Sequence, residues 1–132
     1  MMLPGGETSA KSREPLPAAH APIDHQVLGR LLCDDRGAID EVLRQFLAAC
    51  PNDARALSAA LSAADSKAAL RCAHRLKGAC RMMGAEPLAD VCERIERAVR
   101  AGDRRILAAV GNLDREAERV ADYLRNWLKA GA

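Results

Sequence analysis

Apolar residues spaced three and four positions apart along most of the chain are the feature that most limits its fold. The pattern is clearest near the C-terminal end, where one apolar stripe spans about six helical turns: Ile106, Val110, Leu113, Ala117, Val120, Leu124 and Trp127. Residues with this spacing lie on one face of an α-helix, and such a face must pack against other apolar surfaces. The pattern therefore predicts a bundle of amphipathic helices.

The composition agrees with an all-α fold. Hydrophobic residues make up 49% of the 132 residues but aromatic residues only 2%, whereas sheets favour aromatic and β-branched side chains. A chain of this length suffices for one domain and is short for two. Residues 1–22 hold four of the six prolines and no helical period, so we interpret them as a disordered tail or linker. Residues 23–130 form the predicted folded domain.

Capping residues and turn signals divide this domain into helices. Asp24 is a candidate N-cap for a short first helix, whose predicted buried stripe is Val27, Leu28, Leu31 and Leu32. A longer apolar period follows from Ile39 to Leu61. Pro51 interrupts it, because proline removes one helical hydrogen bond. The sequence is compatible with one kinked helix and with two helices that meet at Pro51.

Clear capping and turn residues mark the boundaries of the later helices. Asp65 or Ser66 is expected to cap the next helix, which ends near Gly84. Pro87 suits the first turn of the helix that follows. The core stripe of that helix is Leu88, Val91, Cys92, Ile95 and Val99. Short connections favour antiparallel neighbours, so we predict an up-down four-helix bundle with a short additional N-terminal helix.

Charge and hydropathy argue against several classes of function. The formal net charge of +2 gives no whole-molecule attraction to nucleic acid or anionic lipid. No run approaches the roughly 18 to 20 apolar residues of a membrane span, so we expect a cytoplasmic location without membrane insertion. The five cysteines are interpreted as buried thiols that bind no metal. A metal site on Cys72, His74 and Cys80 fails, because residues two apart on a helix point about 200° apart.

His74 lies opposite the apolar stripe of its own helix. Within about 60° of it on a helical wheel lie four cations and a glycine: Lys67, Arg71, Lys77, Gly78 and Arg81. A histidine on an open face, among cations and beside a residue without a side chain, indicates a phosphate-accepting site. The imidazole of such a site must be unprotonated, exposed and able to approach phosphorus in line.

Three segments in order resemble the histidine-containing phosphotransfer (HPt) domain family of two-component phosphorelays. They are the H-x-x-K-G stretch in residues 73–79, the Gly-Ala turn followed by Leu-Ala in 83–89, and the C-E-x-x-E stretch in 91–96. The similarity covers residues 23–128. It implies a phosphocarrier that accepts a phosphoryl group on His74 from a receiver-domain aspartate and passes it to another receiver, without kinase activity of its own.

The resemblance also implies partners. They are receiver domains of a hybrid sensor kinase, of a response regulator or of both, and the receiver would supply Mg²⁺, so no cofactor is expected in this chain. We expect a monomer that binds no nucleic acid. The chain is either a free-standing protein or the C-terminal module of a membrane-bound hybrid sensor kinase.

Four residues besides His74 receive predicted roles. Lys77, one turn along the same face, is placed to stabilise charge on the phosphoryl oxygens. Gly78 leaves room for the docking domain, although glycine costs a helix about 1 kcal/mol relative to alanine. Glu96 lies on the flank of the next helix, and the wheel and the resemblance both nominate it as the acceptor that fixes the ring tautomer. Arg100, one turn further, is placed to touch phosphate or an acidic partner.

The open face of the His74 helix is also predicted to bind the partner. Leu70 is an apolar residue suited to contact a receiver, and Arg71, Arg75 and Arg81 form a basic face. The alternative function is a non-catalytic helical adaptor or regulator that docks through this basic face. A dimerising histidine-kinase core is a further alternative, which predicts an acidic or polar residue after the histidine and a nearby proline, whereas Arg75 and Gly78 stand here.

Overall fold

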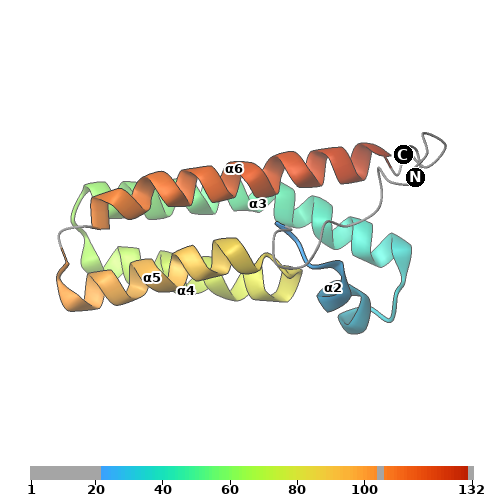
Figure 1. Cartoon of the computed structure of the whole chain (residues 1–132), viewed down its shortest axis with the longest axis horizontal. Coiled ribbons are helices and arrows are strands. Elements are labelled where there is room, and N and C mark those ends of the chain that lie inside the picture. Colours follow the sequence, from blue (N-terminus) through green and yellow to red (C-terminus); the bar gives the residue numbers. More distant parts are fainter. Residues whose placement is uncertain (1–21, 104–105, 131–132) are drawn as a thin grey trace, which may run out of the picture.

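The computed structural model describes residues 22–103 and 106–130, and for residues 106–109 only the backbone. In this part of the chain the secondary structure is entirely helical, so the predicted all-α fold is confirmed. The helices, labelled as in Figure 1, are α2 (His25–Leu31), α3 (Arg36–Ser62), α4 (Ser66–Met83), α5 (Glu86–Ala101) and α6 (Ile106–Ala130). The tail predicted for residues 1–22 lies outside the described residues except for Pro22.

The four long helices form an antiparallel bundle (Figure 1). α4 packs against α3 and α5, and α6 packs against the same two helices. Residues 63–65 join α3 to α4, and residues 84–85 join α4 to α5. Connections this short require antiparallel neighbours, so the predicted up-down bundle is confirmed. The short helix α2 lies beside one end of the bundle and contacts α4 (Figure 1).

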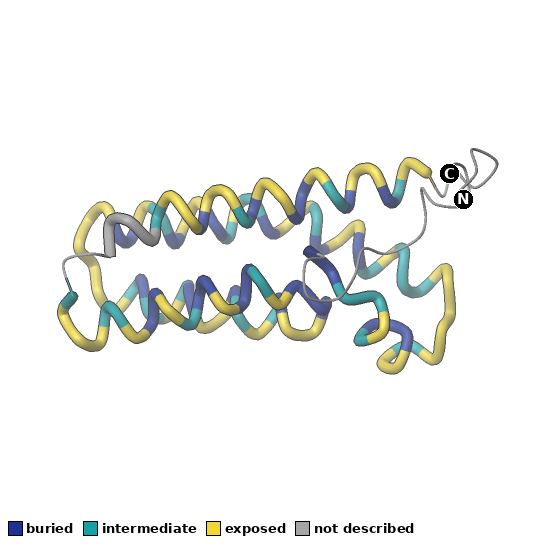
Figure 2. Tube along the Cα trace, in the orientation of Figure 1, coloured by how far each residue is buried: buried dark blue, intermediate teal, exposed yellow. Residues whose placement is uncertain are grey.

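The core is filled by one apolar face of each bundle helix. Figure 2 shows buried positions recurring along the inward side of the helices. The largest fully buried apolar side chains come from every element: Ile23, Leu28, Leu43, Leu57, Leu76, Leu88, Ile95, Leu113 and Leu124. Burial of each such side chain stabilises the fold by roughly 1.5 to 3 kcal/mol, which exceeds the differences of up to about 1 kcal/mol in helix propensity among residues other than proline. In the α6 stripe, the side chain of Ile106 lies outside the described part.

One predicted core residue is wrong. The sequence predicts Leu31 in the buried stripe of the first helix, but 54% of its surface is exposed. The buried face of α2 contains Leu28 and Gly29, with Leu32 partly buried beside them. On a helical wheel the centre of this face lies about 100° from Leu31, which therefore points to solvent. A helix of seven residues gives too short a period to fix the buried direction from sequence.

Pro51 lies inside α3, which continues without a break from Arg36 to Ser62. Of the two possibilities compatible with the sequence, one helix is therefore correct. Phe46 and Cys50 before the proline and Ala54 after it are all buried, so the apolar face runs across the interruption. Packing of this face offsets the hydrogen bond that proline removes.

The five cysteines differ in how far they are buried. Cys50, Cys80 and Cys92 are buried, Cys72 is half-buried, and Cys33 is exposed in the turn after α2, contrary to the prediction of buried thiols. Burial raises the pKa of Cys50 to about 11 and that of Cys92 to about 12. These thiols therefore stay protonated at neutral pH and pack as small apolar side chains.

Polar and aromatic contacts attach α2 to two helices of the bundle, α4 and α6. The Asp24 carboxylate caps α2 by accepting from the Gln26 amide, and the Asp24 amide donates to the Gly84 carbonyl at 2.7 Å. His25 Nε2 lies 2.8 Å from the Tyr123 hydroxyl, and the His25 and Trp127 ring centroids are 4.0 Å apart. The N-terminal helix is therefore held against both α4 and α6.

Gly84 and Gly102 end α4 and α5 in the same left-handed conformation, with φ of 76° and 66°. A Cβ on Gly84 would collide with the backbone carbonyl of Asp24, whereas nothing lies within 4 Å of a Cβ on Gly102. Gly102→Ala should therefore lower the free energy of unfolding by about 1 kcal/mol through strain alone. Gly84→Ala should lower it by about 3 kcal/mol, because the clash displaces α2 as well. Urea denaturation measures both, and equal losses would contradict the proposed role of Gly84.

Candidate functional site

His74 stands on the outer face of α4. The inner face of the same helix is buried: Ala69, Ala73, Leu76, Cys80 and Met83. This burial fixes the rotation of α4, and His74 is then turned to solvent, with 77% of its side chain exposed. Asp65 caps the helix by accepting from the Ala68 amide, and Gly84 ends it, as the sequence predicts. The exposed position predicted for His74 agrees with the structure.

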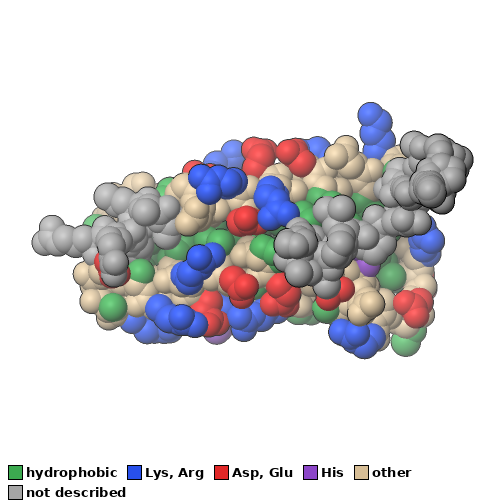
Figure 3. Space-filling view, viewed as in Figure 1, with side chains coloured by type: hydrophobic (Ala, Val, Ile, Leu, Met, Phe, Trp, Pro, Cys, Tyr) green, Lys and Arg blue, Asp and Glu red, His purple; other side chains and the backbone are tan. Residues whose placement is uncertain are grey.

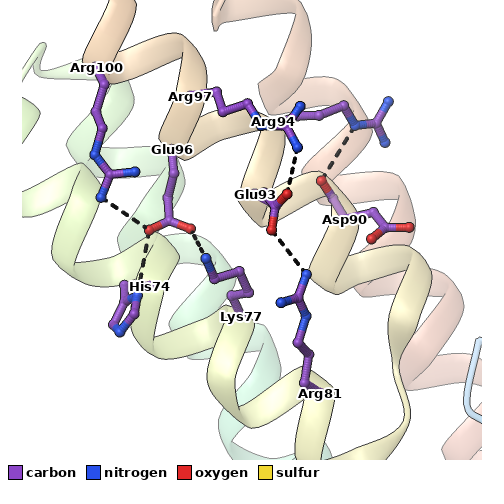
Figure 4. Close-up of polar contacts among 9 residues, drawn as sticks. All are labelled: His74, Lys77, Arg81, Asp90, Glu93, Arg94, Glu96, Arg97 and Arg100. Atoms are coloured by element: carbon purple, nitrogen blue, oxygen red, sulfur yellow. Dashed lines mark hydrogen bonds and ion pairs between the residues drawn. The ribbon is translucent and has the colours of Figure 1, made fainter.

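A buried carboxylate lies beneath His74. Glu96 comes from α5 and is only 1% exposed, and it is the one charged residue among the described residues that is buried. Its Oε2 lies 3.6 Å from Nδ1 of His74. Figure 4 marks this contact with a dashed line. This distance is longer than a hydrogen bond, but the carboxylate faces Nδ1 and not Nε2. The predicted proximity of Glu96 to the ring agrees with the structure.

The shortest contact of this carboxylate is with Lys77. The ammonium Nζ lies 2.5 Å from Oε1 of Glu96, and only 19% of the lysine side chain is exposed. Sequence reasoning placed Lys77 beside His74 as a donor to phosphoryl oxygens and did not identify this pair. In Figure 4 the lysine side chain extends from α4 toward Glu96. A helical wheel places Lys77 on the flank of its helix, but its pairing with Glu96 depends on the distance between α4 and α5, which the sequence does not give.

Arg100 and Gly78 complete the surroundings of the ring. Arg100 Nη2 lies 3.7 Å from Oε2 of Glu96, and 62% of the arginine side chain is exposed, so this contact is open to solvent. Gly78 is exposed one turn after His74, and a Cβ built there would meet nothing within 4 Å. No contact within the described part of the chain therefore explains a glycine at this position.

The predicted partner-binding residues occupy different environments. Arg71 and Arg75 are exposed, whereas Leu70 is partly buried. Arg81 is bound by Glu93 of α5 at 3.1 Å, and Glu93 also accepts from Arg97 at 2.6 Å (Figure 4). Hydrogen bonds from these two guanidinium groups, that of Arg97 first, lower the pKa of Glu93.

Sequence reasoning missed Glu93 and Arg97. Their spacing of four residues on one helix face is a signal for an ion pair that could have found them. Together with Arg100 they extend the charged surface from α4 onto α5. The site is therefore built by two helices that pack against each other and not by α4 alone.

This arrangement suits a nucleophilic imidazole. A carboxylate that faces Nδ1 favours the tautomer with its proton on that nitrogen. Nε2 then carries the lone pair and is turned away from Glu96 toward solvent. A nitrogen in this state can attack an electrophilic centre presented by a second molecule.

Two further properties concern the described residues alone. No group of three or more His, Cys, Asp or Glu side chains among them could hold a metal ion. None of the helices in this part of the chain has the length and apolar character needed to cross a membrane.

Comparisons with known proteins bear on this geometry. A family model described as the Hpt domain matches residues 41–129, which include every site residue named above. The sensor histidine kinase GacS of Pseudomonas protegens is 34% identical over 85 residues, which make up 64% of this chain and 9% of the kinase. The chain thus spans a small part of that relative's length.

A solved structure shares the fold. The crystal structure of histidine-containing phosphotransfer protein B (HptB) from Pseudomonas aeruginosa PAO1 is 29% identical to this chain, with a TM-score of 0.74. The match covers 82% of this chain and 95% of the other. The match therefore extends over most of both chains.

Removal of one partner from the Lys77–Glu96 pair tests its contribution to stability. Lys77→Met should lower the free energy of unfolding by about 3 kcal/mol, because it leaves the Glu96 carboxylate buried without its nearest counter-charge. The double variant Lys77→Met/Glu96→Gln should recover most of this loss, since no buried charge remains. Arg81→Met, which breaks an exposed pair on the same helix, should change stability far less. Equal losses in the single and double variants, measured by urea denaturation, would rule out this electrostatic account.

Proposed function

The chain belongs to the Hpt domain family, and we propose on this premise that His74 is the residue that carries the phosphoryl group in a two-component phosphorelay. Hpt domains exchange phosphoryl groups with the receiver domains of sensor kinases and response regulators. The observation that most supports His74 is its exposed ring over the buried carboxylate of Glu96. With the proton held on Nδ1, Nε2 is free to react.

The proposed reaction is a direct exchange between two side chains. The lone pair on Nε2 attacks the phosphorus of a receiver aspartyl phosphate, a new N–P bond forms, and the P–O bond to the aspartate breaks. The aspartate leaves as a carboxylate, so no proton needs to move at Nε2. The reverse exchange passes the phosphoryl group to another receiver. Mg²⁺ in this exchange would belong to the receiver site.

Exposed guanidinium groups around His74 support binding of an acidic partner. Arg71 and Arg75 lie on α4, and Arg97 and Arg100 lie on α5 with 72% and 62% of their side chains exposed. Cations in this position attract a phosphorylated, acidic receiver surface and bind phosphoryl oxygens. Elsewhere acidic and basic side chains are intermixed, as the face in Figure 3 shows. This supports a protein partner and not nucleic acid, which would favour an extended basic surface.

The role within a larger system follows from the same proposal. The chain acts as a carrier without ATP-dependent kinase activity, and it works in the cytoplasm as a monomer. It is either a separate protein or the module of a hybrid sensor kinase, as the similarity to a short part of GacS suggests.

Replacement of the histidine is the central test. His74→Gln should reduce labelling by a ³²P-phosphorylated receiver to background, because no ring nitrogen remains to form the N–P bond. Its fold should be retained, since the side chain is exposed. His25→Gln is the matched control and should still accept the label, because that ring packs on Trp127 and Tyr123 instead. Acid-labile label at wild-type level in His74→Gln would refute the assignment.

Gly78 provides a test that separates docking from folding. Gly78→Ala should stabilise α4 by about 0.5 to 1 kcal/mol, because alanine is the better helix former and its Cβ meets nothing in the chain. The same methyl group should slow phosphoryl transfer about tenfold by displacing the partner. Gly111→Ala, also exposed and unobstructed in a helix, should stabilise similarly without slowing transfer. Unchanged transfer in Gly78→Ala, measured by rapid-quench kinetics, would argue against a docking role.

A further inference from the structure

Three cysteines lie inside the bundle, outside the site described above. Cys50 of α3 is 1% exposed, and Cys80 of α4 and Cys92 of α5 are fully buried. The proposed phosphoryl transfer uses none of them, although a pair of thiols can be oxidised to a disulfide. All three belong to the same apolar core. Their positions relative to one another therefore decide whether two of them can react together.

An ion pair between α4 and α5 shows that Cys80 and Cys92 stand at one level of the bundle. Arg81 of α4 pairs with Glu93 of α5 at 3.1 Å (Figure 4). Each cysteine immediately precedes one partner of this pair in the sequence. At about 1.5 Å per residue in antiparallel helices, this register places the two cysteines within about 3 Å of each other along the bundle axis. Because both side chains are fully buried, they face the same layer of the core.

The electrostatics of these thiols agree with this proximity. Burial raises the pKa of Cys80 most, and Cys92 raises it further, ahead of Cys50. Such an influence of one thiol on another requires a short distance between them. The pKa of Cys92 is raised to about 12 by burial, Cys50 and Glu96. Nearby Lys77 opposes this increase, so Cys92 is the more readily ionised thiol of the pair.

We propose that Cys80 and Cys92 form an intrachain disulfide when the chain meets hydrogen peroxide, and that this bond ties α4 to α5 next to the His74 site. The sulfur of Cys92 attacks one peroxide oxygen, the O–O bond breaks, and a sulfenic acid and water form. The sulfur of Cys80 then attacks the sulfenic sulfur, the S–O bond breaks, and the disulfide and a second water form. The two waters take up both thiol protons, and the two electrons lost by the thiols reduce the peroxide.

Burial makes this bond slow to form and slow to break. Both thiols are protonated at neutral pH, and peroxide reaches them only when the packing between α4 and α5 opens briefly. The disulfide, once formed, is equally shielded from reducing thiols. The pair therefore responds to sustained oxidation and not to brief exposure.

The disulfide lies close enough to the site to affect it. Cys80 follows Lys77 by three residues on α4, and Cys92 precedes Glu96 by four on α5. A disulfide holds its two Cα atoms about 4.4 to 6.8 Å apart, so it fixes the spacing of the helices that carry them. Fixed spacing at this level restricts the adjustment of α4 and α5 when His74 meets a partner. This effect on phosphoryl transfer rests on the proposed function, whereas formation of the disulfide does not.

Peptide mapping of the oxidised chain tests the pairing. Trypsin cleaves after lysine and arginine and leaves each cysteine on its own peptide, so a linked pair of peptides identifies the disulfide. The full-length Cys33→Ala/Cys72→Ala variant is used, because these two less buried thiols would react first. After prolonged exposure to hydrogen peroxide, peptides 78–81 and 82–94 should be joined. A disulfide from Cys50, or no disulfide in the core, would overturn the proposal.

Variants within the core separate pairing from packing. Oxidation should raise the urea midpoint of the chain, because the bond constrains the unfolded state. Cys80→Ala should abolish this rise. Cys50→Ala, which also removes a buried sulfur, should retain it. A rise that persists in Cys80→Ala, or disappears in Cys50→Ala, would assign the effect to another pair.

Phosphoryl transfer tests the effect on the site. The oxidised chain should accept label from a phosphorylated receiver about fivefold more slowly than the reduced chain, and peroxide should not slow transfer in Cys80→Ala. Equal rates in the oxidised and reduced chains would refute this effect. If no receiver labels the reduced chain, the proposed function is wrong, and peptide mapping still decides whether the disulfide forms.

Discussion

A carboxylate withdrawn from water must have cations close to it, and Glu96 imposes this requirement where α4 meets α5. Lys77 meets the requirement from the neighbouring helix, and His74 lies beside the same carboxylate. The Lys77–Glu96 contact therefore joins the two helices directly beside the His74 ring. A shift of either helix along its axis would separate the charges. The bundle thus needs no loop to build its site, because the site is part of the packing between two rigid elements.

The rest of the fold supplies the support for this contact. α3 and α6 pack against the other sides of α4 and α5, so that the site helices are held by an apolar core of leucine, isoleucine and small residues. Small residues such as Ala69, Ala73 and Cys80 on the inner face of α4 allow close approach of its neighbours. The continuous α3 spans the bundle despite Pro51, since its apolar face is uninterrupted. Because α3 and α6 support the two site helices, the exposed His74 ring is kept at a defined distance from the buried Glu96 carboxylate.

Much of this arrangement could be predicted from the sequence, because it depends on local signals. The helical period, the cap at Asp65 and the glycine at Gly84 each act within one turn of the chain, and they gave the helices and the outward direction of His74. Leu31 was misplaced since its helix is too short to show a period. The pairing of Lys77 with Glu96 was missed for a different reason. Helical wheels assign each side chain to a face, but the choice of partner by a long lysine side chain depends on the distance between two helices.

The attachment of α2 has a consequence for observing this protein. The chain has a single tryptophan, Trp127, and its ring lies against His25 of α2 and near Tyr123 of α6. Its fluorescence emission therefore arises from the junction of the N-terminal helix with the bundle, while His74 stands on a different helix. An emission spectrum consequently reports detachment of α2 without any added label. Trp127 fluorescence from this junction and the chemical state of His74 can therefore be measured independently in the same sample.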